Sequence, residues 1–322
     1  MNKERKVIIV LVFLIILLSL TYIFKINEYE KINKDYTNLV NGDNLIIPKE
    51  EAKAKVIEYE SIIDFASWYF PDKFIYFGYD GISFLDIDET LITNNYRDKE
   101  NKSNFSYLNN RLVYKDDSGL QTITGIDVSY HQGDIDWQKV KDDGIQYAFI
   151  RVGYRGYESG EIVLDSKFED NIKGANEVGI DVGVYFFSGA NTIDEGIEEA
   201  KFVLENIKPY NVSLEVVFDM EDIDEHYHRM IHLETKDKTA ITKAFCDHIK
   251  SNGYTPMVYG NSKWLIESLD YNEIEQYPIW YANWSNYHWP YRVDYYQYTD
   301  SGMVAGINTL VDMNIKFPSL EN

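Results

Sequence analysis

The stretch Val216-Val217-Phe218-Asp219-Met220-Glu221-Asp222 is an apolar run that ends in acidic residues. Two valines and a phenylalanine are typical of a buried strand, and the carboxylates mark the end at which this strand leaves the core. Asp219 and Glu221 are two residues apart, so in a strand their side chains point to the same face, about 6–7 Å apart along the chain. The stretch therefore predicts a central strand with a pair of carboxylates at its carboxyl end.

This carboxylate pair suits acid-assisted cleavage of a glycosidic bond. Two carboxyl groups at the edge of an apolar core do not share one pKa, because desolvation and mutual repulsion favour keeping one of them protonated. Glycosidic cleavage needs one carboxylic acid and one carboxylate. Solvated loop residues and helix caps give the same spacing, so the spacing alone leaves both interpretations open.

Strands and helices alternate on both sides of this central strand. Helices are expected as a short segment ending at Gly144, from Asp165, from the capping box Thr192-Ile193-Asp194-Glu195, and around 239–251. Further strands are expected at residues 125–130, 147–152, 182–187, 257–259, 279–281, 295–298 and 310–314. Four strand-helix alternations followed by closely spaced strands predict an α/β fold, a parallel (β/α)-type barrel of eight strands whose later helices are reduced.

Acidic residues fall near the ends of several of these expected strands. In barrels of this kind the active site lies at the carboxyl ends of the strands, so residues far apart in the chain converge there. The residues predicted to meet in this way are Asp127, Tyr185, Asp219, Glu221 and Asp312. Their convergence favours an enzyme.

Aromatic residues are concentrated between Tyr277 and Tyr298, where they occupy ten of 22 positions. Sugar rings present apolar C–H faces, which flat aromatic side chains cover at low entropic cost. Packing in the barrel core is the alternative, and it is expected for about half of the inward-facing aromatics. The residues predicted to bind sugar are Tyr185, Trp280, Trp284, Tyr287, Gln297 and Tyr298, with Trp289 as a further groove candidate.

Three ordered motifs resemble a known family. The segment Gly125-Ile126-Asp127-Val128-Ser129-Tyr130-His131-Gln132-Gly133-Asp134-Ile135-Asp136-Trp137 resembles the opening motif of the family 25 glycoside hydrolases, the N-acetylmuramidase lysozymes. Phe218-Asp219-Met220-Glu221 resembles their D-x-E strand. The segment from Gln297-Tyr298 through Gly306 to Val311-Asp312-Met313-Asn314 resembles their closing motif, and the resemblance covers about residues 124–317.

The resemblance implies a barrel of five βα units and three further strands that cuts the β-1,4 bond between N-acetylmuramic acid and N-acetylglucosamine. By position, Glu221 is then the general acid and base, and Asp219 assists the substrate's 2-acetamido group as it attacks the anomeric carbon. Asp127 and Asp312 are supporting carboxylates. Tyr296 stands where the family usually has a tryptophan, which concerns subsite preference. A non-catalytic cell-wall glycan-binding or scaffolding protein on the same barrel is the alternative.

Composition limits the partners and cofactors. The net charge of −22 and the pI near 4.6 argue against nucleic acid, because phosphate binding needs clustered lysine and arginine. The family resemblance implies the glycan strand of peptidoglycan as the partner and no cofactor. His228 and His232 have the spacing of a helical metal pair, yet no metal is expected, since they have no cysteine partner. Cys246 is expected to pack within a helix.

The N-terminus predicts a membrane anchor. Residues 1–6 are basic, and Val7 to Phe24 is an uncharged run that as a helix would rise about 27 Å, close to the roughly 30 Å hydrocarbon core. No small-residue cleavage site follows, so an uncleaved signal anchor is expected, with a cleaved signal as the alternative. The basic flank predicts residues 1–6 in the cytoplasm and residues 25–322 outside, which makes a single-pass protein of the cell membrane.

Residues between the anchor and the barrel are expected to form a stalk at 25–60 and a small β-rich module at 61–120 whose role the sequence does not disclose. Strands are expected in this module near 68–71, 74–78 and 111–115. Phe84 to Ile92 resembles the first motif of haloacid-dehalogenase-type phosphatases, but too few residues follow for the α/β domain of such an enzyme. Residues 121–322 are the predicted catalytic barrel domain.

Overall fold

The structure, a computed structural model, describes residues 62–70, 73–91, 104–116, 119, 121–223, 228–284 and 287–318. The chain divides into two compact units, Met1–Ile75 and Tyr76–Asn322. The predicted anchor at 7–24 and stalk at 25–60 lie outside the described residues. Within the described ranges, no helix combines the length and the apolar character needed to cross a bilayer.

The segment before the barrel contains one described helix and two pairs of strands. The helix α3 spans Ile62–Tyr69, so the strand expected from residue 68 is wrong. The apolar side chains of Ile63 and Ala66 are buried three residues apart, and this helical spacing outweighs the β-propensity of the aromatic residues that follow. The strands expected near 74–78 and 111–115 are confirmed as β1 (Lys73–Gly78) and β4 (Arg111–Tyr114).

Each of these strands forms a two-stranded sheet with its neighbour in the chain. β1 pairs with β2 (Gly81–Asp86), and β4 pairs antiparallel with β3 (Phe105–Leu108). The turn between β3 and β4 is Asn109-Asn110, whose φ angles of 52° and 62° suit a tight hairpin turn, in which asparagine is common. Arg111 then forms a 2.5 Å ion pair with Asp143, which fixes the β3–β4 hairpin to the barrel.

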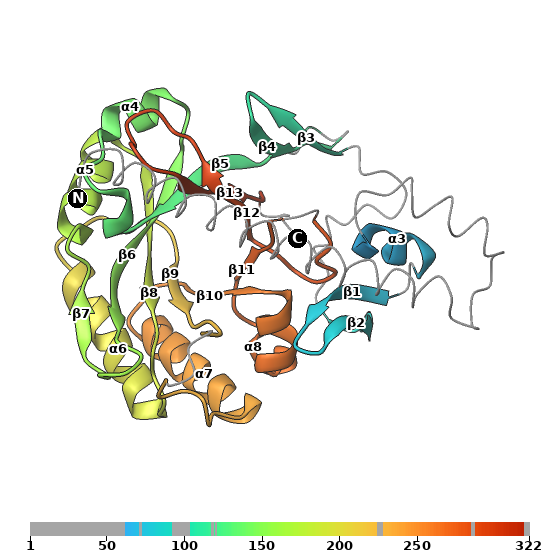
Figure 1. Cartoon of the computed structure of the whole chain (residues 1–322). Helices are drawn as coiled ribbons and strands as arrows, with labels where there is room; N and C mark the ends of the chain where they lie inside the picture. Colours follow the sequence, from blue (N-terminus) through green and yellow to red (C-terminus); the bar gives the residue numbers. More distant parts are fainter. Residues whose placement is uncertain are drawn as a thin grey trace, which may run out of the picture. The chain divides into compact units, whose positions relative to one another are not determined.

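Eight strands close into a barrel in the order β5-β13-β12-β11-β10-β9-β8-β6, and β6 pairs with β5 to complete the ring (Figure 1). The short strand β7 (Ile162–Leu164) extends the edge of β6. The barrel strands are β5 (Ile123–Val128), β6 (Tyr147–Arg155), β8 (Asp181–Phe187), β9 (Val216–Asp219), β10 (Pro256–Asn261), β11 (Ile279–Ala282), β12 (Tyr295–Gly302) and β13 (Val311–Lys316).

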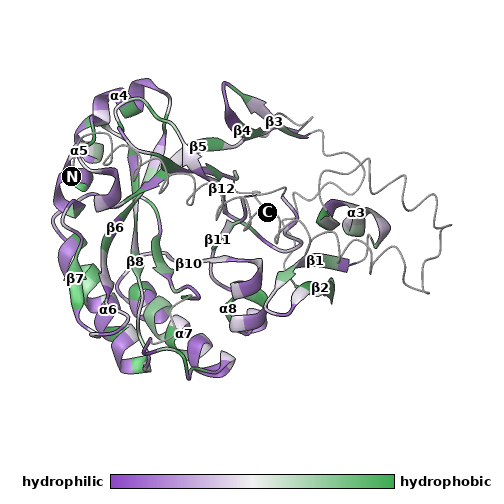
Figure 2. Ribbon diagram, in the orientation of Figure 1, coloured by the Kyte–Doolittle hydropathy of each residue, from purple (hydrophilic) through white to green (hydrophobic). Residues whose placement is uncertain are grey.

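Helices separate the first strands and cover the outside of the barrel. They are α4 (Trp137–Asp142), α5 (Phe168–Val178), α6 (Ile193–Ile207), α7 (Thr235–Ser251) and, after β10, a π-helical turn (Trp264–Ser268) with α8 (Tyr271–Ile274). Thr192 caps α6 as predicted, because its hydroxyl accepts the Glu195 N–H at 3.2 Å. Cys246 is buried in α7. Figure 2 shows hydrophobic and hydrophilic stretches alternating along these helices, as amphipathic helices on a sheet require.

Five strand-helix units are followed by three strands, as the resemblance implied. The prediction that all eight strands are parallel is wrong, because β13 runs antiparallel to both β12 and β5. A parallel return needs a crossover of a dozen or more residues, commonly a helix, whereas only residues 303–310 join β12 to β13. This short connection reverses the chain direction at the last strand.

Aromatic residues fill the barrel interior. Side chains alternate along each strand, so Tyr147 and Phe149 of β6 face inward and meet Trp280 of β11 and Tyr295 of β12. The rings of Phe149 and Trp280 stack with centroids 4.6 Å apart. Glycine makes room for them: a Cβ on Gly183 would lie 2.3 Å from the Phe149 ring. The interior is therefore a packed core. We call the end of the barrel at which its parallel strands finish the mouth.

Candidate active site

The carboxyl ends of the strands bring four acidic residues together. Asp127 lies near the end of β5, Asp219 is the last residue of β9, and Glu221 follows two residues later. Because β13 is antiparallel, its beginning lies at this same end, and Asp312 pairs in register with Asp127. Asp127 and Asp219 are buried, whereas Glu221 and Asp312 are half-buried and reach the surface.

Two amide side chains link these carboxylates. Gln297 Nε2 donates to Asp127 Oδ2 at 3.0 Å and lies 3.4 Å from Asp312 Oδ2. Asn314 Nδ2 donates to the same oxygen of Asp127 at 2.7 Å. Each amide thus turns its N–H groups toward a carboxylate.

Donors on the other side fix the orientation of both amides. The Oε1 atom of Gln297 accepts the Tyr259 hydroxyl at 2.9 Å and the Trp284 indole N–H at 3.2 Å. The Oδ1 atom of Asn314 accepts the Trp280 indole N–H at 2.8 Å. With their oxygens occupied in this way, the amides can only donate to the carboxylates, which positions Asp127 rigidly.

The carboxyl groups at the mouth have pKa values well above their ordinary range. Burial and, to a smaller extent, the nearby charge of Asp127 raise the pKa of Glu221 to about 7, although a hydrogen bond with Asp219 opposes this rise. Burial, followed by the Glu221 charge, raises the pKa of Asp219 well above its ordinary value. Burial and the Asp127 charge raise the pKa of Asp312 to about 9. Carboxyl groups this close titrate as one set, so the mouth holds both protonated and ionised acids near neutral pH.

Asp219 keeps one oxygen unpaired. The side chain is 6% exposed, and its Oδ1 atom has no hydrogen-bond partner among the residues that the structure describes. A buried acceptor without a partner costs about 1–3 kcal/mol, so native proteins rarely retain one without a use. A ligand that donates an N–H or O–H group would satisfy this oxygen.

The predicted sugar contacts separate into two groups. Trp284 is 59% exposed beside Gln297, and Tyr185 lines the interior of the mouth, where the charges of Asp127, Asp219 and Asp312 act on it. Trp280 is buried in the core beneath the mouth. Tyr287 packs against Phe105 and Phe317, Tyr298 against Tyr107, and Trp289 is buried against Tyr281. The structure therefore brings Tyr185, Gln297 and Trp284 to the acids. It does not bring Trp280, Tyr287, Tyr298 or Trp289 there, and Trp280 is linked to Asp127 through Asn314.

Two residues of the mouth were missed by the sequence analysis. Tyr259 ends an expected strand, and its inward direction follows from alternation with Met257. Asn314 shares a face of β13 with Asp312, a relation that the same period of two would have shown. His228 and His232 lie outside the mouth network. Across the described residues, no group of three or more His, Cys, Asp or Glu side chains is arranged to hold a metal ion.

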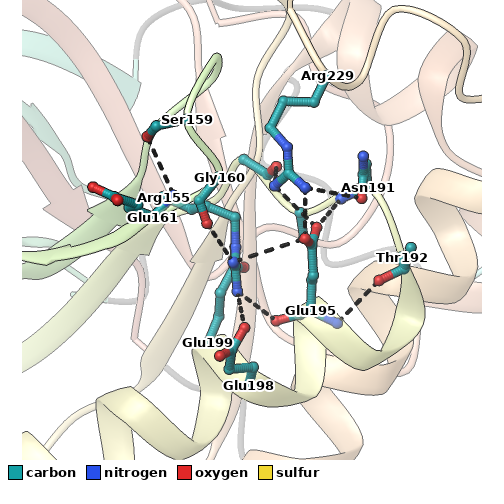
Figure 3. A network of polar contacts seen from close by, with 12 residues as sticks. Arg155, Ser159, Gly160, Glu161, Asn191, Thr192, Glu195, Glu198, Glu199 and Arg229 are labelled. Atoms are coloured by element: carbon teal, nitrogen blue, oxygen red, sulfur yellow. Dashed lines mark hydrogen bonds and ion pairs between the residues drawn. The ribbon is translucent and has the colours of Figure 1, made fainter.

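A second polar network surrounds Arg155, the last residue of β6 (Figure 3). Arg155 Nε donates to Glu199 Oε1 at 2.8 Å, and its Nη2 donates to Glu198 Oε2 at 2.7 Å. The other oxygen of Glu199 accepts the Ser188 hydroxyl at 2.7 Å, and the Ser188 N–H donates to the Asp219 carbonyl at 2.7 Å. Burial raises the pKa of Glu199 to about 7. The network thus joins α6 to the backbone that carries the Asp219 carboxylate.

The sequence profile of the glycosyl hydrolases family 25 matches residues 126–307. The autolytic lysozyme of Clostridium acetobutylicum is 23% identical over 192 residues, which make up 59% of this chain and 54% of that protein. The chain thus spans about half the length of this relative.

Two solved structures share the barrel fold. The modular autolysin LytC from Streptococcus pneumoniae, in complex with a synthetic peptidoglycan ligand, has a TM-score of 0.56 at 24% identity, covering 76% of this chain and 56% of LytC. A family 25 glycosyl hydrolase from Bacillus anthracis has a TM-score of 0.52 at 23% identity, covering 62% of this chain and 90% of that protein's chain. Since the family profile covers more than half of the chain and includes Asp127, Asp219 and Glu221, this chain belongs to the glycosyl hydrolases family 25.

Proposed function

We propose that this protein is a muramidase, a lysozyme that hydrolyses the β-1,4 bond between N-acetylmuramic acid and N-acetylglucosamine in peptidoglycan. The main support for this proposal is that Asp219 and Glu221 lie together at the barrel mouth and have raised pKa values. The family assignment and the lysozyme among the relatives support the same reaction. LytC, with its peptidoglycan ligand, supports a glycan strand as the bound partner.

Glu221 is the proposed general acid and base. With a pKa of about 7 it is protonated in much of the population at neutral pH, so it can give its proton to the glycosidic oxygen as the C1–O bond breaks. The resulting Glu221 carboxylate then accepts a proton from the water that attacks C1 in the second step. Its half-buried position leaves it open to the substrate.

Asp219 is the proposed partner of the substrate's acetamido group. Its unpaired Oδ1 atom would accept the acetamido N–H, which orients the acetamido oxygen for attack on C1 and stabilises the positive charge that develops on the ring formed. Asp127 and Asp312 have a supporting role, because Gln297 holds them in place. Tyr185 and Trp284 are the proposed sugar contacts.

The test is a digest of purified peptidoglycan with mass analysis of the new reducing ends. N-acetylmuramic acid ends are expected from the parent protein, and they should form about 10²- to 10⁴-fold more slowly with Glu221→Gln. N-acetylglucosamine ends would indicate a different glycosidase. Absence of new ends across the pH range, together with retained glycan binding, would favour the alternative, a non-catalytic glycan-binding or scaffolding protein on the same barrel.

The location of the enzyme is proposed from the sequence alone. The uncharged run at residues 7–24 and the basic residues before it support an anchored protein whose barrel lies outside the cytoplasm. Protease treatment of intact cells tests this arrangement. The barrel should be digested from outside, whereas full protection would contradict the proposed orientation.

A further inference from the structure

Arg151 is a buried cation at the barrel mouth. It follows the inward-facing Tyr147 and Phe149 by the period of two along β6, and it pairs in register with Tyr185 of β8. The side chain is only 8% exposed. Its charge acts on Asp219, where it opposes the rise in pKa, and on Tyr185. Arg151 therefore lies among the side chains that surround the proposed substrate site.

Packing holds the guanidinium group in one orientation. Its Nε atom donates to Asp165 Oδ2 at 2.8 Å, and the Tyr130 backbone N–H donates to the same oxygen at 3.1 Å. The central carbon of the group lies 5.0 Å from the ring centroid of Tyr130 and 5.5 Å from that of Tyr154. Contacts on the edge and on the faces of the plane leave little freedom of rotation.

One arm of this fixed group has no partner. The buried Nη2 atom of Arg151 makes no hydrogen bond to any residue that the structure describes. A desolvated cationic donor without an acceptor is more costly than a neutral one, so proteins seldom leave one unpaired in the interior. Both Asp219 Oδ1 and Arg151 Nη2 are unpaired in the same mouth, one an acceptor and one a donor. Such a pair is complementary to two adjacent groups on one ligand.

The chemistry of the sugar identifies the second group. If Asp219 holds the acetamido group on C2, the neighbouring substituent is the one on C3. In N-acetylglucosamine this substituent is a hydroxyl, whereas in N-acetylmuramic acid it is a lactyl ether that ends in a carboxyl or amide-linked carbonyl oxygen. A guanidinium N–H is a strong donor to such an oxygen. In a mouth that otherwise carries carboxylates, a positive charge also offsets repulsion of an acidic substituent.

We infer that Arg151 Nη2 binds the lactyl carboxyl oxygen of the N-acetylmuramic acid residue whose acetamido group Asp219 holds, and so selects N-acetylmuramic acid over N-acetylglucosamine. This inference rests on the proposed function. It makes Arg151 a specificity-determining residue, while Glu221 performs the proton transfer for either sugar.

The decisive variant is Arg151→Lys, which keeps a cation for Asp165 but loses the second arm. Activity is measured on peptidoglycan glycan chains and on N-acetylglucosamine oligomers, which lack the lactyl group. We expect kcat/KM on peptidoglycan to fall by about 10- to 100-fold, through KM more than kcat, with little change on the oligomers. Arg151→Met should show the same loss of discrimination. An equal loss on both substrates would contradict the inference and would mean that Arg151 only supports the fold.

A binding measurement separates this inference from the proposed function. In a Glu221→Gln background, the disaccharide N-acetylglucosaminyl-N-acetylmuramic acid and the N-acetylglucosamine dimer are titrated calorimetrically, with and without Arg151→Lys. Preference for the muramic acid disaccharide that disappears with Arg151→Lys supports the inference even if the parent protein cleaves nothing. Preference unchanged by the variant overturns it.

The matched control is Arg111→Lys, which alters an arginine–aspartate ion pair outside the mouth. It should leave the ratio of the two activities unchanged. Thermal unfolding of all variants identifies any loss that comes from an unstable fold.

Discussion

Asn314 donates a 2.7 Å hydrogen bond to Asp127 across 187 positions of sequence. The contact exists because β13 returns antiparallel beside β5, which places Asn314 opposite Gly125 and Asp312 opposite Asp127. A parallel last strand would put its first residues at the opposite end of the barrel. The reversed strand therefore completes the acidic mouth.

Replacing Glu221 by glutamine should abolish proton donation while keeping size and most contacts. We expect hydrolysis of peptidoglycan to fall by about 10²- to 10⁴-fold, because general acid–base catalysis supplies that much. Release of reducing ends measures the rate, and co-sedimentation with peptidoglycan measures binding. Asp222→Asn is the matched control, since this exposed neighbour forms a surface ion pair with Lys263 and should lose little. Equal losses in both variants would refute the assignment.

The activity should depend on pH through Glu221. This group must be protonated to act, and its pKa is about 7, so kcat/KM should fall as pH rises above about 7. In Asp127→Asn the negative charge that raises this pKa is removed. The alkaline limb of the profile should then move to lower pH. A shift to higher pH, or none, would show that Asp127 does not act electrostatically on Glu221.

Stability should also depend on pH through Asp219. Its folded pKa lies well above the ordinary 3.8, so the folded state binds more protons than the unfolded state and loses stability as pH rises through that interval. Asp219→Asn removes this loss. We expect the variant to be more stable than the parent at pH 8, by about 1–3 kcal/mol, and the difference to shrink toward pH 4. Urea unfolding at both pH values measures it. Equal stability of the variant and the parent at pH 8 would show that burial of the Asp219 carboxylate does not destabilise the folded state.

The contributions of Arg155 and Glu199 to the free energy of unfolding should depend on each other. Both side chains are buried, so Arg155→Met leaves an uncompensated carboxyl group, and we expect a loss of about 3–5 kcal/mol in the free energy of unfolding. The double variant Arg155→Met, Glu199→Leu should recover a large part of it. Denaturant unfolding of the two single variants and the double variant gives the coupling energy. Additive losses would mean that the pair contributes no specific interaction.

Trp284 should contribute to binding more than to stability. It is 59% exposed, so Trp284→Ala removes aromatic surface at the mouth without opening a cavity. We expect KM for peptidoglycan to rise by about 2- to 10-fold at a nearly constant unfolding temperature, as aromatic contacts contribute about 0.5–1.5 kcal/mol. Trp289→Ala, at a buried tryptophan, is the contrast and should lower the unfolding temperature markedly. An unchanged KM in Trp284→Ala would remove it from the substrate site.

Local periodicity predicted the barrel, four of its strand-helix units and the carboxylate pair Asp219 and Glu221, because these features depend on residues close together in the chain. The fifth unit was expected only from the family resemblance. The direction of β13 became known from the folded structure, in which the connection before it is too short for a crossover. The folded structure also decided which aromatics face the mouth: Trp284 reaches it, whereas Tyr298 and Trp289 pack elsewhere. The raised pKa values and the unpaired arm of Arg151 also needed the folded structure, because desolvation results from packing between distant segments.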